Sequence, residues 1–268
     1  MADSFRVGII GYGNMASAIV GGALRSGVFR AGDTTVYDTS EAALSSAKEH
    51  GMKVSASADE LIESADVILV SVKPQQLADV FSHLSCDAAG KCFISIVAGK
   101  PIEYFSSRLP GAYIVRVMPN TPIMLGYGAS AISVSPGVPD VFRDFAIGVF
   151  SGSGLVELID EAQMDAVVAV NGSSPAYFFH LAELVVENAK AEGIPAGTAL
   201  RLFAATMEGA SHMLLDTGKS PEELRKQVCS PGGTTLAALD AMAEHGFDDA
   251  FVAGLDACTR RSKELGIS

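Results

Sequence analysis

Residues 6–19 read Arg6-Val7-Gly8-Ile9-Ile10-Gly11-Tyr12-Gly13-Asn14-Met15-Ala16-Ser17-Ala18-Ile19, and this stretch joins an apolar strand, a glycine turn and the start of a helix. The apolar residues Val7, Ile9 and Ile10 suit a buried strand of a parallel sheet. The strand, turn and helix signals follow one another in register, which is more specific than a glycine motif alone. The stretch therefore predicts the opening unit of a dinucleotide-binding fold, and a purely structural turn is the alternative.

The small residues of this stretch explain how it would hold a cofactor. Gly11 permits the tight turn, Gly13 lets the backbone approach a pyrophosphate, and Ala16 lets the helix pack closely on the strand. The pyrophosphate would lie at the positive N-terminal end of this helix, where Asn14 and Met15 stand. These five residues are therefore the first candidates for cofactor binding.

Length and composition limit the function classes. With 268 residues the chain can bury a large core, and we expect two domains. A net charge of −12, without any cluster of Lys and Arg, argues against nucleic-acid binding. Mean hydropathy is +0.31, but charges and glycines interrupt every apolar run short of the ~18 residues that a membrane-spanning helix needs. We therefore expect no membrane association, and the excess of apolar residues suggests a subunit interface.

The N-terminal residues and the cysteines indicate a compartment and a redox state. Residues 1–5 lead directly into the first strand without the basic and apolar segments of a signal peptide, so we expect a cytoplasmic protein. The four cysteines show no CxxC spacing and no zinc pattern with the five histidines. We therefore expect ordinary thiols and no metal.

Strand and helix patterns alternate up to about residue 159 and then change. Apolar and β-branched runs predict strands near residues 34–38, 52–54, 66–72, 92–97, 113–118, 127–134 and 154–158. This alternation predicts an α/β Rossmann domain, doubly wound around a mostly parallel sheet, over residues 1–159. Only helical patterns follow, at 162–170, from Ser174 to a stop at Gly193, and at 196–217, so residues 160–268 are expected to form an all-α domain. The apolar residues of 196–217 extend well beyond one helix face, which suggests packing against another subunit.

The second predicted strand ends at an acid. The carboxylate of Asp38, followed by Thr39, can accept hydrogen bonds from an adenine-ribose hydroxyl and would repel a 2′-phosphate. No Lys or Arg follows until Lys48, so the sequence favours NADH over NADPH. The alternative is that Asp38 merely caps the helix that starts near Ser40.

Three further strand ends supply candidate cofactor contacts. Ligands of open parallel sheets gather beyond the carboxyl ends of the strands, so Val72, Lys73 and Pro74 should line the cleft. Ala98 follows the next strand, and Asn120, in a rigid turn after the sixth, can hydrogen-bond a nicotinamide or a substrate. Asn120 shaping its own turn is an equal alternative, and Lys73 alone would more often be a solvated loop residue.

A second candidate site lies in the helical half. Residues 229–240 place two glycines and two threonines directly before an amphipathic helix, which leaves backbone N–H groups free at a positive dipole end. This arrangement suits a small anion such as a carboxylate, and the alternative is an elaborate N-cap. The candidate substrate-binding residues are Ser230, Gly232, Gly233, Thr234 and Thr235.

A nicotinamide site and a carboxylate site together imply hydride transfer to a small acid. No His or Lys lies in a motif near these glycines, whereas reduction of a ketone requires a proton donor for the developing alkoxide. A protonated imine needs no such donor, because its nitrogen already carries the charge that makes the carbon electrophilic. Positioning beside the nicotinamide can then supply most of the catalysis.

Five motifs in order resemble those of the pyrroline-5-carboxylate reductase family along nearly the whole chain; they are residues 11–15, 72–74, 116–122, 174–177 and 230–235. The resemblance implies reduction of 1-pyrroline-5-carboxylate to L-proline, the last step of proline biosynthesis, with NADPH or NADH. It also implies a Rossmann domain and a helical domain that interlocks with its twin in a homodimer, and dimers of this family can form larger rings.

The resemblance also carries roles to single positions. It implies that residues 11–16 hold the cofactor phosphates, that residues 72–74 line the cleft and that residues 230–235 hold the substrate carboxylate. Thr235 would be the catalytic residue and would hydrogen-bond the ring nitrogen. Its role would be orientation more than proton transfer, because an alcohol is a poor acid near neutral pH.

The sequence departs from the family pattern at three positions. Ser174 stands where the family usually has Gly, and Ala58 where many relatives carry an Asn that contacts the adenine ribose. Asp38 replaces the Ser, Thr or Arg of many relatives, which supports the preference for NADH.

Two alternative functions remain open at the level of sequence. A β-hydroxyacid dehydrogenase or another imine reductase should show a catalytic Lys or a different substrate loop. A non-enzymatic dinucleotide-binding sensor would bind the cofactor without turnover.

Overall fold

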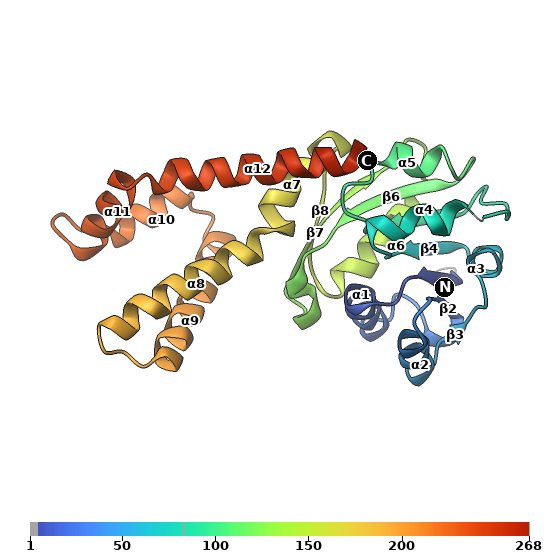
Figure 1. Cartoon of the computed structure of the whole chain (residues 1–268), viewed down its shortest axis with the longest axis horizontal. Coiled ribbons are helices and arrows are strands. Elements are labelled where there is room, and N and C mark those ends of the chain that lie inside the picture. The colour runs from blue at the N-terminus through green and yellow to red at the C-terminus, as the bar shows by residue number, and fades with distance from the viewer. Residues whose placement is uncertain (1–4, 83, 268) are drawn as a thin grey trace. The chain divides into compact units, whose positions relative to one another are not determined.

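The computed structural model describes residues 5–82 and 84–267, and these residues pack as two units. The first contains residues 5–173 together with 258–267, and the second contains residues 174–257. Figure 1 shows a sheet flanked by helices in the first unit and helices alone in the second. The predicted fold class, a Rossmann domain followed by a helical domain, is confirmed.

The first unit is built on one eight-stranded sheet. Its strands lie in the order β3-β2-β1-β4-β5-β6-β7-β8, and every neighbouring pair is parallel except the antiparallel pair β6 and β7. The strand order reverses at β1, so the carboxyl ends of β1 and β4 form the switch point where such sheets bind ligands. The strands are β1 (Val7–Ile10), β2 (Thr34–Tyr37), β3 (Lys53–Val54), β4 (Val67–Val70), β5 (Cys92–Ser95), β6 (Tyr113–Met118), β7 (Gly128–Val134) and β8 (Gly154–Leu158).

Helices cover both faces of this sheet, which explains why its central strands read as continuous apolar runs. Neighbouring residues of β1 point to opposite faces, so Ile9 belongs to one core cluster and Ile10 to the other. The first cluster includes buried residues of α1 (Asn14–Arg25), α2 (Glu41–Glu49) and α6 (Asp140–Ser151). The second includes buried residues of α3 (Ala58–Ser64), α4 (Pro74–Ser82) and α5 (Ile102–Ser106).

The chain after β8 remains part of the first unit, which differs from the predicted boundary after residue 159. A 3-10 turn (Glu161–Gln163), α7 (Met164–Val167) and a π-helical turn (Val168–Gly172) replace the single helix predicted at 162–170. Arg116 of β6, with a side chain 5% exposed, holds this segment through ion pairs with Glu161 (3.4 Å) and Asp165 (3.6 Å). Ser262, from the end of the last helix, donates a hydrogen bond to Asp165 (2.7 Å). The sequence therefore changes from strand to helix patterns near residue 160, whereas the chain leaves the first unit only after residue 173.

The second unit consists of helices. These are α8 (Ser174–Ala191), α9 (Ala196–Asp216), α10 (Pro221–Val228), α11 (Thr234–Glu244) and most of α12 (Phe247–Ile267). The predicted helices at 174–192 and 196–217 are present, whereas α5, α10 and α12 were not predicted from the sequence.

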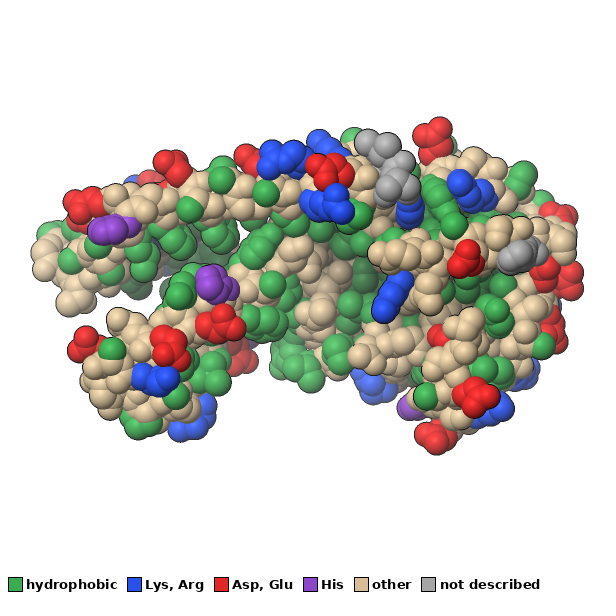
Figure 2. All heavy atoms as spheres, viewed as in Figure 1, with side chains coloured by type: hydrophobic (Ala, Val, Ile, Leu, Met, Phe, Trp, Pro, Cys, Tyr) green, Lys and Arg blue, Asp and Glu red, His purple; other side chains and the backbone are tan. Residues whose placement is uncertain are grey.

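The helical unit leaves much apolar surface uncovered. Within the chain α9 buries only Ala199 fully, whereas Leu202 is 63% and Leu215 69% exposed. On α8, Phe179 is 63% exposed, and Figure 2 shows hydrophobic side chains at the surface of this unit. The apolar side chains of residues 196–217, which we expected to be buried, therefore stay largely exposed within a single chain. None of the helices in the described residues is long and apolar enough to span a membrane.

Candidate functional site

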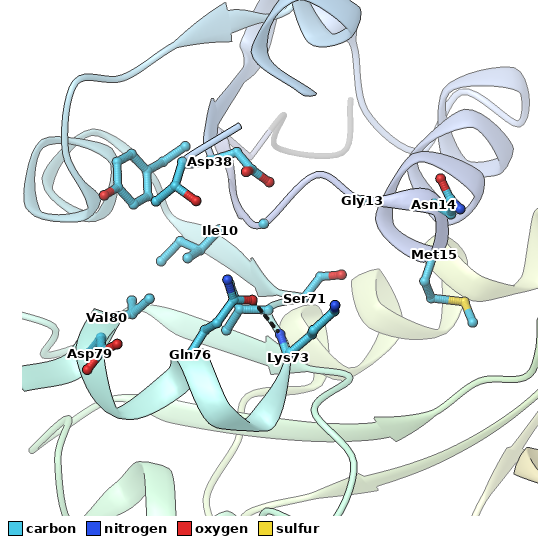
Figure 3. A pocket seen from close by; sticks show the side chains of 14 residues that line it. Ile10, Gly13, Asn14, Met15, Asp38, Ser71, Lys73, Gln76, Asp79 and Val80 are labelled. Carbon is cyan, nitrogen blue, oxygen red and sulfur yellow. Dashed lines mark hydrogen bonds between the residues drawn. The ribbon is translucent and has the colours of Figure 1, made fainter. Parts of the chain in front are cut away.

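A pocket of about 480 Å³ lies at the carboxyl ends of β1, β2 and β4, at the switch point of the sheet (Figure 3). Its walls come from three segments, namely the glycine turn with the start of α1, the end of β2, and the end of β4 with α4. Eight predicted cofactor residues line it: Gly11, Gly13, Asn14, Met15, Asp38, Thr39, Val72 and Lys73. The structure thus brings most of the predicted cofactor residues into one cavity.

The glycine turn fits a phosphate group. Gly11 has φ of +87°, and a Cβ there would meet the Ser71 carbonyl oxygen and Val72 Cγ1, both at 2.9 Å. Gly13 is the N-cap of α1 and makes no side-chain cap hydrogen bond, and a Cβ placed on it would meet nothing within 4 Å. The N–H groups of the first turn of α1 thus have no side-chain acceptor, and a helix end of this kind favours an anion.

Asp38 connects the end of β2 to the glycine turn. Its Oδ2 accepts a hydrogen bond from the Tyr12 N–H (2.7 Å) and its Oδ1 accepts one from the Ser40 N–H (2.8 Å). The Gly11 N–H also donates to the Tyr37 carbonyl (2.9 Å), so two bonds hold the turn against β2. The cap of α2 is the Ser40 hydroxyl, which accepts from the Ala43 N–H (3.4 Å). Asp38 thus orders the turn, and each of its oxygens keeps a second lone pair for a ligand.

The glycine turn itself is packed into the core through Tyr12, which is 5% exposed. Burial raises the pKa of the Tyr12 phenol, so this side chain stays neutral near pH 7.

Lys73 brings the positive charge of the pocket. Its backbone N–H donates to Gln76 Oε1 (3.4 Å), while its exposed ammonium has no partner among the described residues. An ammonium at this place can attract the phosphates of a dinucleotide.

Six lining residues were not predicted from the sequence: Ile10, Tyr37, Ser71, Gln76, Asp79 and Val80. Three of them share a signal that could have been read. Gln76, Asp79 and Val80 follow i, i+3, i+4 spacing in the helix that Pro74 opens, so they lie on one helix face.

Four predicted cofactor residues do not line the pocket. Ala16 is fully buried beneath it in the core, Pro74 begins α4, and Ala98 lies exposed after β5. Asn120 is 8% exposed, and its side chain donates to the Asn171 carbonyl (3.2 Å) and accepts from the Ala129 N–H (2.9 Å). The side chain of Asn120 therefore ties the end of β6 to the backbone of Ala129 and Asn171, which both lie outside its own turn.

The predicted substrate turn lies between α10 and α11 in the second unit. Gly232 has φ of +70°, and the Gly233 N–H donates to the Ser230 carbonyl (2.9 Å). A Cβ on Gly233 would meet Ser230 Oγ at 2.5 Å and the Ser230 carbonyl oxygen at 3.0 Å, so a larger residue there would displace the Ser230 side chain, while the positive φ favours glycine at position 232. Gly233 is the N-cap of α11, and no side chain caps this helix. The first N–H groups of α11, at Thr234 and Thr235, are therefore open to an anion rather than satisfied by an N-cap.

The glycine-turn pocket at the switch point of a doubly wound sheet, joined to a helical domain, defines an oxidoreductase of the Rossmann class that uses NAD(P)H. A family model described as NADP oxidoreductase, coenzyme F420-dependent, matches residues 6–99. A second model, described as pyrroline-5-carboxylate reductase dimerisation, matches residues 161–265. The chain belongs to the pyrroline-5-carboxylate reductase family.

Full-length relatives support this assignment. The pyrroline-5-carboxylate reductase of Methanosarcina acetivorans is 34% identical over 98% of this chain and 99% of its own. A solved pyrroline-5-carboxylate reductase from Coxiella burnetii has a TM-score of 0.87 at 31% identity, covering 98% of this chain and 99% of its own. The Plasmodium falciparum pyrroline carboxylate reductase, solved with NADP bound, has a TM-score of 0.88 at 25% identity and covers 99% of both chains.

Proposed function

We propose that this protein reduces the C=N bond of 1-pyrroline-5-carboxylate to give L-proline, the last step of proline biosynthesis. The observation that carries the proposal is that one chain has two helix N-termini with a glycine N-cap and no side-chain cap, an arrangement that suits an anion. One is the glycine turn of the NAD(P)H pocket, and the other is the uncapped, hydroxyl-rich turn at residues 230–235. The full-length relatives named pyrroline-5-carboxylate reductase give the same substrate.

The pocket residues would bind and orient the cofactor. The N–H groups at the start of α1, behind Gly13, would hold the pyrophosphate, with Lys73 adding charge. Asp38 would accept hydrogen bonds from the adenine ribose through the lone pairs that the backbone leaves free. Bound there, NAD(P)H supplies the hydride. Support for the fit comes from the open space at Gly13, which a side chain would fill.

The substrate turn would hold the carboxylate of the imino acid. Thr234 is exposed and Thr235 half-buried, no side chain caps the start of their helix, and the hydroxyls of Ser230, Thr234 and Thr235 add donors. Thr235 would hydrogen-bond the ring nitrogen and thereby orient the C=N bond. Hydride transfer requires that the bound imine carbon lies against the nicotinamide ring of the cofactor. A protonated imine already carries the positive charge that the reaction needs, so no general acid is assigned.

We further propose that NADH is preferred over NADPH. The negative charge of Asp38 would stand beside a 2′-phosphate and repel it. The relative solved with NADP bound argues for testing both cofactors.

The exposed apolar residues of α8 and α9 support a homodimer formed through the helical unit. A larger ring of dimers and a cytoplasmic location complete the proposal, by analogy with a biosynthetic enzyme of this family.

The decisive experiment follows the loss of reduced-nicotinamide absorbance with pyrroline-5-carboxylate, using NADH and NADPH in separate assays and measuring proline as the product. Stoichiometric proline formation is expected, faster with NADH. Cofactor binding without turnover would show that the protein is a dinucleotide-binding sensor rather than an enzyme. Turnover only with other cyclic imines would change the substrate. Faster turnover with NADPH would support the proposed reaction but overturn the proposed preference for NADH.

A further inference from the structure

Helix α4 presents three side chains to the cofactor pocket. Gln76, Asp79 and Val80 share one helix face and all line the cavity. In Figure 3 Asp79 and Val80 lie toward the end of the pocket marked by Asp38, and Met15 lies at the opposite end.

This end of the pocket is where the adenosine would lie, provided that the pocket binds NAD(P)H as proposed above. The pyrophosphate belongs at the glycine turn, beside Gly13, and the adenine ribose belongs at the carboxyl end of β2, beside Asp38. The adenine then extends from Asp38 toward the side of α4 that carries Asp79.

The walls of this end suit a flat purine. Tyr37 and Val80 are half-buried and line the cavity, with Ile10 and Val72 completing its apolar surface. Aromatic and branched side chains of this kind pack against the faces of a base and leave its polar edge to be read by other groups.

Asp79 is the polar group placed to read that edge. Its side chain is exposed and lines the cavity, and no donor within the described residues forms a hydrogen bond or an ion pair with its carboxylate. An ionised carboxylate only accepts hydrogen bonds. The exocyclic amino group of adenine is a donor, whereas the 6-oxo group of hypoxanthine at the same position is an acceptor. A carboxylate that faces position 6 therefore attracts the amino group of adenine and repels the oxygen of hypoxanthine, whose donor on this edge, N1–H, lies one ring position away.

We propose that Asp79 is a specificity-determining residue, which accepts a hydrogen bond from the adenine amino group and rejects dinucleotides that carry a 6-oxopurine. A hydrogen bond to a charged group contributes about 1.5 kcal/mol or more, which corresponds to about a tenfold change in Kd.

The test compares NADH with its hypoxanthine analogue, reduced nicotinamide hypoxanthine dinucleotide. Kd is measured for the complete protein by titration of the reduced-nicotinamide fluorescence, which needs no turnover. The wild type should bind NADH about tenfold more tightly than the analogue. Asp79→Asn should bring the ratio close to one, because an amide both accepts and donates, and Asp79→Ala should lower it by weakening NADH binding.

Gln75→Ala is the matched control, because Gln75 lies on the same helix, is exposed and does not line the pocket. It should keep the wild-type ratio. Equal affinity of the wild type for both dinucleotides would overturn the proposal, as would a wild-type ratio in Asp79→Asn or a loss of the ratio in Gln75→Ala. Turnover of pyrroline-5-carboxylate is assayed separately, so absent turnover with intact base discrimination refutes the proposed reaction and leaves the role of Asp79 standing.

Discussion

Replacing Asp38 by Asn separates two roles that one carboxylate combines. The structure shows it accepting hydrogen bonds from the N–H groups of Tyr12 and Ser40, at 2.7 and 2.8 Å. The proposed second role is to favour NADH by its charge. Asn keeps the size and one accepting oxygen, but its amide nitrogen cannot accept from the second N–H. The variant therefore loses one bond to the backbone and the negative charge together.

The two losses have different effects on the two cofactors. A hydrogen bond to a charged group contributes about 1.5–3 kcal/mol, and the half-buried position of Asp38 favours the lower value, so loosening the turn should raise Kd for NADH about tenfold. For NADPH the same loosening is offset by the removed repulsion, which is about 1–2 kcal/mol for charges at the surface. The Kd for NADPH should therefore change little, and the preference should move about tenfold toward NADPH.

The assay is fluorescence titration with both cofactors, together with kcat and KM for pyrroline-5-carboxylate reduction. Glu41→Gln is the control, since it removes an exposed negative charge at the start of α2 without touching the pocket. It should leave both Kd values near those of the wild type. Unchanged Kd for NADH in Asp38→Asn would show that the turn does not depend on this carboxylate. An unchanged ratio would show that Asp38 does not read the ribose.

Three further variants and one titration test other parts of the molecule. Thr235→Ala should lower kcat about tenfold or more and leave cofactor Kd unchanged in the fluorescence titration, because the hydroxyl orients only the substrate; weakened cofactor binding would contradict that role. Gly13→Ser should abolish detectable cofactor binding, because its side chain enters the open space where the pyrophosphate would lie, and urea unfolding should show no loss of stability. Gly32→Ser is the control, since its side chain also meets open space but lies outside the pocket, and it should bind the cofactor normally. Arg116→Met should lower the free energy of unfolding by about 2–4 kcal/mol in urea titrations, because the carboxylates of Glu161 and Asp165, each about one-third exposed, lose their buried cation. A loss below about 0.5 kcal/mol would refute this anchoring role. The pKa of Asp66 lies below its usual value, chiefly through the side-chain hydrogen bond from Arg6. The stabilisation that Asp66 contributes is therefore present above its unfolded pKa of about 4 and is lost as pH falls through its folded pKa. Asp66→Asn should flatten this part of a curve of unfolding free energy against pH, and an unchanged curve would contradict the role of Asp66.

The sheet unit was predicted well because buried strands and glycine turns leave their signals in short runs of neighbouring residues. The run at Asp66–Val72 is continuous and apolar, since β4 is covered by helices on both faces, and its bounds were recovered within about two residues. The glycine turn was equally readable, because Gly11 needs a positive φ that other residues adopt only at a cost.

Features that depend on distant partners were not readable in this way. Asn120 has the composition of a ligand-binding turn, but Asn171 and Ala129, which occupy its side chain, are brought there by the tertiary fold. That the compact first unit extends beyond residue 159 was unreadable for a similar reason. Arg116 attracts Glu161 and Asp165 onto the sheet, and no local pattern at residue 160 reports a cation on β6.

The N-caps of the helices bear on the two helix ends that we propose bind anions. Ser40, Ser57 and Ser220 cap α2, α3 and α10, and each serine side chain accepts a hydrogen bond from one N–H of the first turn of its helix. The caps of α1 and α11 are instead Gly13 and Gly233, which offer no side-chain acceptor. A helix end without such an acceptor leaves N–H groups that only solvent or a ligand can satisfy. Proline, which also offers no side-chain acceptor, stands at the N-caps of α5, α6 and α9, so a missing cap alone does not mark a ligand site. At Gly13 the missing side chain also leaves room beside the helix end, which fits the anion proposed there. The two ends match the two negatively charged groups of the proposed reaction, the cofactor pyrophosphate and the substrate carboxylate.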